Sequence, residues 1–364
     1  MIMRHRSLVS TALAMSAGLV TAACTVSLGG AGQAGAASPA APPASTSPAS
    51  ASAVAQASAA PAGHGPADSL LTEPGQGFGP VYGLLGQART SVDLTMYELS
   101  DPVAEADLAA AARRGAVVRV ILDHREEHTN AAAYDYLRAH GVHVTWYSSA
   151  YTYTHQKTLV VNNSVAIILT ANLTSRYYAT SRDFGVVDTD PRDVAAITAT
   201  FSADFAHAAI TPGRGDDLVW SPTTAQASLL GLINGARHSL RVYTEEMADT
   251  TIENALASAA RRGVTVQVVG ENTDGQYDQA YAALAKAGVQ IRYYDSPSGF
   301  YIHGKMILAD YGTPAARVYL GSENFSETSL DRNRELGLII AGPAIMASLA
   351  HTFAGDFAHG IAVR

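Results

Sequence analysis

Two short segments of the sequence each place a histidine two residues before a lysine: HQKTLVVN at 155–162 and HGKMILAD at 303–310. Residues two apart in a strand point to the same face, so each segment directs an imidazole and an ammonium to one side. An imidazole can attack or protonate, and an ammonium can hold an anionic oxygen. The two copies together predict a two-histidine phosphoryl-transfer site formed by His155, Lys157, His303 and Lys305.

The motif is duplicated because the region around it is duplicated. AARRG at 111–115 recurs at 259–263, an offset of 148 residues (111 to 259), and a β-branched apolar run follows each copy. VDLTMYE at 92–98 aligns in the same way with LRVYTEE at 240–246. A repeat of this length indicates a duplicated domain and not a solenoid.

Each copy alternates predicted strands with predicted helices. Asp101 is expected to cap a helix that has Pro102 at its first position, and Gly115 is expected to end it. The apolar runs 117–122 and 264–269 suit strands covered on both faces. This pattern predicts an α/β fold with two similar α/β/α sandwich halves and mixed, largely parallel sheets. We expect the halves to span 69–215 and 216–364.

The N-terminal region has a different composition. Residues 1–24 combine early basic residues with an apolar, uncharged run, which is typical of a signal peptide and too short for a membrane span. Cys24 closes this run in a context that resembles a bacterial lipobox. A lipid anchor on the outer face of the cytoplasmic membrane and simple secretion both fit. Residues 25–68 are rich in Ala, Pro and Ser, which predicts a disordered linker.

Charge and cysteine content restrict the function further. The chain of 364 residues has a formal net charge of −8, and no run of Lys or Arg stands out. A nonspecific nucleic-acid binder normally has a basic footprint, so the composition favours other phosphodiesters without excluding DNA or RNA. The single cysteine rules out an intramolecular disulfide.

Further polar residues recur after each motif. A turn with an asparagine follows the next strand in both copies, as TAN at 170–172 and GSEN at 321–324. Such turns present donors at the end of a strand, where α/β proteins bind ligands. A carboxylate then follows an arginine in each copy and could fix the tautomer of a catalytic histidine, or simply pair with that arginine. The predicted residues are Asn172, Asn324, Ser322, Asp183 and Glu335.

These features together resemble the phospholipase D superfamily, with the pattern H-x-K-x4-D, a G-S-x-N turn and a downstream carboxylate. The resemblance implies that the two halves share one site on a pseudo-twofold axis. It also implies a phosphohistidine intermediate, with His155 as the nucleophile and His303 as the acid, and no cofactor or metal. Lys157, Lys305, Asn172, Asn324 and Ser322 would bind the phosphate oxygens.

The first copy departs from the family pattern at two places. Asn162 stands where the second copy has Asp310, and TAN replaces the G-S-x-N turn. The last motif residue is five after the lysine and therefore points to the other face of a continuous strand. We expect Asn162 and Asp310 to have structural roles.

The substrate is less constrained than the chemistry. Segments rich in Tyr, Ser and Gly lead into the two motifs and are expected to line the mouth of the site. We expect a phospholipase D-like enzyme outside the cytoplasm that cleaves a phospholipid headgroup ester at a membrane surface, with transfer to an alcohol as a second outcome. A metal-independent endonuclease and an inactive cell-surface binding protein are the alternatives. Both half-sites lie in one chain, so a monomer is expected.

A cluster of histidines and glutamates in the first half has no counterpart in the second. It contains His124, Glu126, Glu127 and His128. Because the duplication does not preserve it, we interpret it as a solvated loop and not as a metal site.

Overall fold

The computed structural model describes residues 69–147 and 150–363. The predicted signal peptide, Cys24 and the predicted linker all lie outside the described residues. Within the described part of the chain, no helix combines the length and apolar character that crossing a bilayer requires.

Two eight-stranded sheets, formed by the described residues, have matching strand orders. The first runs β1 (Ser69–Glu73), β9 (Ser181–Asp188), β7 (Val165–Leu169), β6 (Lys157–Val161), β2 (Ser91–Met96), β4 (Val117–Leu122) and β5 (His143–Trp146), and its eighth strand, β15 (Tyr301–Ile302), pairs with β9 beside this path. The second runs β10 (Leu218–Ser221), β19 (Glu335–Ile340), β17 (Arg317–Gly321), β16 (Met306–Ala309), β11 (Ser239–Thr244), β13 (Thr265–Glu271), β14 (Gln290–Tyr294) and β20 (Ile361–Ala362). The duplication seen in the sequence is therefore a duplication of topology.

Both sheets are mixed, and the predicted α/β class with two similar halves is confirmed. Parallel pairing joins β2 to β4 and β4 to β5, and likewise β11 to β13 and β13 to β14. The strands from β1 to β2 and from β10 to β11 pair antiparallel along each sheet. Two short parallel pairs, β3 (Leu99–Ser100) with β8 (Leu173–Thr174) and β12 (Met247–Ala248) with β18 (Phe325–Ser326), lie next to the sheets.

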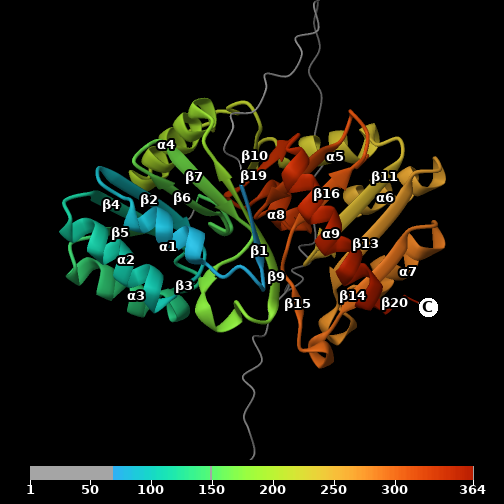
Figure 1. Ribbon diagram of the computed structural model, residues 1–364, viewed down its shortest axis with the longest axis horizontal. Coiled ribbons are helices and arrows are strands. Elements are labelled where there is room, and N and C mark those ends of the chain that lie inside the picture. Colours follow the sequence, from blue (N-terminus) through green and yellow to red (C-terminus); the bar gives the residue numbers. More distant parts are fainter. Residues whose placement is uncertain (1–68, 148–149, 364) are drawn as a thin grey trace, which may run out of the picture. The chain divides into compact units, whose positions relative to one another are not determined.

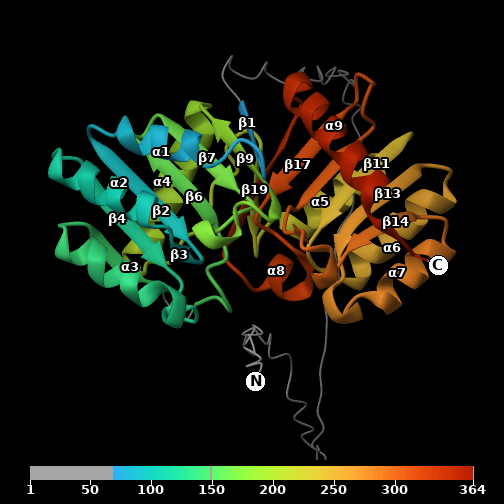
Figure 2. The same ribbon diagram turned by 60° about the horizontal axis from the view of Figure 1, so that its bottom comes forward.

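Helices cover both faces of each sheet (Figures 1 and 2). The first half has α1 (Gly79–Gly86), α2 (Pro102–Arg113), α3 (Glu127–Ala139) and α4 (Pro191–Phe205); the second has α5 (Ala225–Gly235), α6 (Thr250–Arg261), α7 (Asp278–Lys286), α8 (Glu327–Asp331) and α9 (Pro343–His359). The Asp101 carboxylate accepts from the backbone N–H groups of Val103 and Ala104, which caps α2 as predicted. Asp249 caps α6 in the same way.

Helix α3 begins earlier than the sequence indicates. It starts at Glu127, so Glu127 and His128 lie in its first turn and not in the solvated loop that the sequence predicts for them. The buried Asn130 side chain explains the difference, because it accepts from Leu99 N–H and donates to the carbonyls of Tyr97 and Asp123. Asparagine is read from sequence as a turn residue, but here tertiary hydrogen bonds hold it inside a helix.

The described residues fall within one compact unit, which holds three hydrophobic clusters. One cluster packs the first sheet against α1, α2 and α3, and another packs the second sheet against α5, α6 and α7. The third contains residues of both sheets together with α4 and α9, including Phe184, Trp220, Tyr243 and Phe353. The halves therefore share a core on the side where the motifs lie.

Candidate active site

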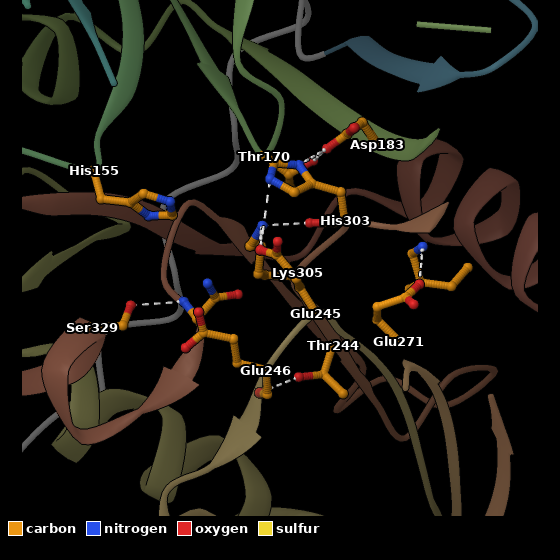
Figure 3. Close-up of polar contacts among 12 residues, drawn as sticks. His155, Thr170, Asp183, Thr244, Glu245, Glu246, Glu271, His303, Lys305 and Ser329 are labelled. Carbon is orange, nitrogen blue, oxygen red and sulfur yellow. Dashed lines mark hydrogen bonds and ion pairs between the residues drawn. The ribbon is translucent and has the colours of Figure 1, made fainter. Parts of the chain in front are cut away.

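Each predicted catalytic histidine is paired with the carboxylate of the other half. The Nδ1 atom of His155 lies 2.7 Å from Oε2 of Glu335. In the other pair, Nδ1 of His303 lies 2.7 Å from Oδ1 of Asp183 (Figure 3). Their sequence positions, each downstream of a motif in its own half, gave no sign of this exchange. A carboxylate at Nδ1 fixes the tautomer that exposes Nε2, the nitrogen available for chemistry.

The exchange follows from two strand contacts that cross between the halves. Strand β15 (Tyr301–Ile302), just before His303, pairs parallel with β9 of the first half (Figure 1). Thr154, just before His155, forms the equivalent parallel bridge with Arg334. Each motif therefore enters the site along the strand that carries the opposite carboxylate.

The arginines beside the two carboxylates have other partners. Arg182 forms a two-point ion pair with Asp356 on α9, at 2.6 and 2.9 Å, and Arg334 pairs with Asp204 on α4 at 3.0 and 3.1 Å. These pairs also cross between the halves. Asp183 and Glu335 are therefore available to the histidines, because the neighbouring arginines form ion pairs with other carboxylates.

Hydroxyl and amide groups hold the two carboxylates from behind. The Thr170 hydroxyl donates to Oδ1 of Asp183 at 2.6 Å (Figure 3). On the other side, Ser329 and Asn333 donate to Oε1 of Glu335 at 2.5 and 2.9 Å. Thr170 thus binds the same oxygen of Asp183 that faces His303, whereas Ser329 and Asn333 bind the oxygen of Glu335 that does not face His155. Among these supporting residues, only Thr170 lies in a segment that the motif analysis singled out.

The two motif lysines are fully buried. Nζ of Lys157 donates to the carbonyl of His155, and Nζ of Lys305 donates to the carbonyl of His303, both at 2.6 Å. Lysine is almost never fully buried without a partner. The repeated contact places each ammonium beside its own histidine, as the spacing in the motif predicts.

Burial and neighbouring charges set the protonation of the site. Burial lowers the pKa of His155 to about 4, although Glu335 opposes this shift. Burial also lowers the pKa of Lys157 to about 7. Burial would raise the pKa of Glu335, but the adjacent His155 outweighs it and holds that pKa below its usual value. With these pKa values His155 is neutral and Glu335 is ionised near pH 7, so Nδ1–H of His155 donates to Glu335 and its Nε2 keeps a lone pair.

The predicted phosphate ligands beyond the lysines differ in accessibility. The Oδ1 atoms of Asn172 and Asn324 are buried without a hydrogen-bond partner. Asn172 donates weakly to Glu98 at 3.4 Å, and Ser329 accepts from the backbone N–H of Asn324. The Ser322 hydroxyl is fully buried and accepts from Leu336 N–H at 3.2 Å, the position Thr170 takes against Phe184 N–H in the first half. Their roles in phosphate binding stay predictions.

The last residue of each motif turns the chain. Asn162 and Asp310 have positive φ angles of 55° and 52°, a conformation that Asn and Asp tolerate better than other side chains. The Asn162 side chain accepts from Arg89 and Thr90 N–H, and Asp310 accepts from the backbone N–H groups of residues 237–239. Both lie away from the histidines, and an amide oxygen serves the turn as a carboxylate does.

A comparison with protein families identifies the family to which the chain belongs. The family model described as "Cardiolipin synthase, PLD-like domain" matches residues 81–205 and 229–357, which is more than half of the chain. The chain belongs to this family. It is therefore a member of the phospholipase D superfamily, whose members act on phosphodiesters.

Solved structures share the fold of this phospholipase D-like protein. Phosphatidylserine synthase from Haemophilus influenzae is similar at a TM-score of 0.61, with 11% identity over 80% of this chain and 86% of that one. Polyphosphate kinase from Porphyromonas gingivalis also has a TM-score of 0.61, with 16% identity, and the match covers 80% of this chain and 50% of that one. At these identities the likeness shows the fold alone. A search of the curated proteins finds no significant match.

The phospholipase D-like site contains one carboxylate that motif reasoning missed. Oε2 of Glu245 lies 2.6 Å from Nζ of Lys305 and 3.6 Å from Nε2 of His303 (Figure 3). Tyr97 takes the aligned position in the first half, where its ring centroid lies 4.6 Å from that of His155 and 4.9 Å from Nζ of Lys157. The aligned segments of the repeat contain both residues. The difference between them, at the end of equivalent strands, was the sequence signal that could have identified Glu245 as a site residue.

A small cavity adjoins the first motif. Its volume is about 260 Å³, and it is lined by Asp123, His124, Arg125, Tyr147, Tyr151, Thr152 and Thr154. Thr154 directly precedes His155, so the cavity reaches the edge of the site.

The described residues contain no group of three or more His, Cys, Asp or Glu side chains able to hold a metal ion. His124 and His128 are exposed and lie near Glu127 and Glu126, respectively.

Proposed function

We propose that this protein is a phospholipase D-like phosphodiesterase that cleaves a phospholipid headgroup ester through a phosphohistidine intermediate. The observation that carries the proposal is the pair of histidines whose Nδ1 atoms are each held by a carboxylate of the opposite half. Figure 3 shows the two imidazoles directed toward one another from opposite sides. One phosphate between them could be attacked from one side while its leaving group is protonated from the other.

In the first step, Nε2 of the neutral His155 attacks phosphorus in line. The N–P bond forms as the bond from phosphorus to the leaving alkoxide breaks, and Nε2 of His303 gives its proton to that alkoxide. Glu335 stabilises the positive charge that develops on the His155 ring. The ammonium of Lys157 and the amide of Asn172 would hold nonbridging oxygens, where preorganised donors contribute on the order of 10²–10³ in rate.

In the second step, the now neutral His303 takes a proton from water or from another alcohol. The oxygen attacks phosphorus, the N–P bond breaks, and His155 returns to its neutral form. Water gives hydrolysis, whereas a primary alcohol gives transphosphatidylation. The protons balance over the cycle because His303 gives one and recovers one.

The acidic surroundings of the site favour a lipid headgroup over nucleic acid. Glu98, Glu126, Glu245, Glu246 and Glu271 lie close enough to the motifs to influence one another or the motif residues electrostatically. Such a surround repels a polyanion, whereas a phosphodiester with a small cationic or neutral headgroup meets no such barrier. The cavity beside Thr154 has room for a small polar group.

The test incubates the full chain, with and without EDTA, with phosphatidylcholine vesicles containing ethanol and separately with single-stranded DNA. We expect phosphatidylethanol and free choline from the vesicles, and loss of both products in His155→Ala. His140→Ala is the matched control, because this exposed histidine ends α3 away from the motifs. Cleavage of DNA without lipid turnover would overturn the lipid assignment in favour of the endonuclease. Absence of turnover on either substrate would favour the binding-protein alternative.

The cellular location is part of the same proposal. The sequence of residues 1–24 supports export, and Cys24 offers a lipid attachment point that would hold the enzyme at a membrane surface. Cell fractionation of the wild type and Cys24→Ala tests this: an anchored protein moves from the membrane fraction to the medium on substitution. A protein found in the cytoplasm in both forms would contradict export.

A further inference from the structure

One difference between the two halves of the site changes the charge beside a motif histidine. Tyr97 and Glu245 are aligned by the duplication, and each follows its strand, β2 or β11, by one position. Tyr97 offers an aromatic ring to His155 and Lys157. Glu245 offers a carboxylate to His303 and Lys305. The duplicated site is therefore electrostatically unequal.

Glu245 contacts three groups around the second motif. Oε2 accepts from Nζ of Lys305 at 2.6 Å and lies 3.6 Å from Nε2 of His303, and Oε1 accepts from the Tyr301 hydroxyl at 2.8 Å. Burial would raise the pKa of Glu245, but the charges of His303 and Lys305 outweigh it and hold that pKa below its usual range. Glu245 is therefore a carboxylate and does not compete with His303 for the proton.

The contacts of the two imidazoles differ accordingly. The ring of His303 lies between two carboxylates, Asp183 at Nδ1 and Glu245 toward Nε2. His155 contacts one carboxylate, Glu335 at Nδ1, and its ring packs against the ring of Tyr97. An opposite charge within about 4–6 Å favours the charged form of a titrating group. The second carboxylate therefore favours an imidazolium at His303, for which His155 has no equivalent.

We propose that Glu245 is a positioning residue that keeps a proton on Nε2 of His303 and so makes His303 the acid and His155 the nucleophile. The division of roles between the histidines rests on the proposed function. The protonation of His303 does not, and it can be measured without any substrate. The observation behind this assignment of acid and nucleophile is that the first half has Tyr97 at the position where the second half has Glu245.

Other charged or titratable groups face His303 and Glu245 from the surrounding elements, and all of them stay in place in the Glu245 variants below. They are Asp183 on β9, Glu98 after β2, His155 before β6, Lys157 at the start of β6, Glu246 after β11, Glu271 at the end of β13, Tyr277 before α7, Tyr301 on β15 and Lys305 before β16.

The direct test follows the titration of His303 by NMR in the full chain labelled with ¹⁵N-histidine. The signals of His303 are assigned by their loss in His303→Ala. In Glu245→Gln, which keeps the shape of the side chain but removes its charge, we expect the titration midpoint of His303 to fall. Glu246→Gln is the matched control, since it removes the neighbouring charge, which has no direct contact with His303, and it should leave the midpoint near that of the wild type.

Glu245→Asp keeps the charge and should restore most of the midpoint, which separates charge from general disturbance of the fold. An unchanged His303 midpoint in Glu245→Gln would overturn the proposal. Kinetics then tell the two proposals apart. A shifted midpoint in a protein without turnover would defeat the proposed function alone. The role of Glu245 alone would be wrong if Glu245→Gln still turns over substrate, the alkaline limb of its pH–rate profile matches that of the wild type, and the His303 midpoint is unchanged.

Discussion

At the scale of single residues, equal motifs do not give equal chemistry. His155 and His303 have the same spacing to a lysine and the same 2.7 Å contact from Nδ1 to a carboxylate. Burial nevertheless lowers the pKa of His155 to about 4, so this ring is neutral over the physiological range. A neutral imidazole with its Nδ1–H donated to Glu335 is the form required of a nucleophile.

The pKa of His155 predicts the acid limit of activity. Because protonated His155 cannot attack, kcat/KM should hold from neutral pH down to about 5. It should then fall about tenfold per unit below pH 4. In Glu335→Gln the fixed tautomer is lost, and kcat should drop by about 10²–10⁴. A pH–rate profile of the wild type and Glu335→Gln checks both points. An acid limb near pH 6.5, the ordinary value for histidine, would contradict the neutral nucleophile.

At the scale of elements, periodic segments were predictable and contacts between halves were not. The strand at 117–122 and the helix capped by Asp101 match the structure closely because their signals are local. Strand β15 has two residues and no local pattern, and it forms only because β9 of the other half is beside it. The sequence could therefore supply the two motifs and the two carboxylates, but not Glu245 and not which carboxylate meets which histidine.

The close contact of β15 with β9 makes Gly304 a sensitive position. A Cβ atom there would lie 2.9 Å from Cε2 of the buried Phe184 and 3.4 Å from the carbonyl of Arg182. Gly304→Ala should therefore push His303 away from Asp183, lower kcat by about 10²-fold and cost about 1–3 kcal/mol of stability in urea unfolding. Gly83→Ala in α1 meets nothing within 4 Å and should instead gain about 0.5–1 kcal/mol. Equal kcat and equal stability in the two variants would show that the contact between β15 and β9 is loosely packed.

At the scale of the whole molecule, the described halves are joined by more than the site. They share one hydrophobic cluster and two buried ion pairs, Arg182 with Asp356 and Arg334 with Asp204. Breaking a buried pair by removing one partner typically costs about 3–5 kcal/mol. Because both histidines depend on the opposite half, the same contacts that stabilise the molecule also complete the site. One chain therefore contains both halves of the candidate site, which is the basis for expecting a monomer.

Mixing two inactive variants tests whether one chain forms its own site. His155→Ala and His303→Ala should each be inactive, and their mixture should stay inactive, because neither chain can lend a half to the other while the shared core is closed. If instead the halves exchange between chains, an intact pair arises from the first half of His303→Ala and the second half of His155→Ala, and activity returns. Measurement before and after joint unfolding and refolding separates an exchange that is slow from one that does not occur. Activity that returns on simple mixing, and rises with the square of protein concentration, would show that the working unit is a dimer with exchanged halves.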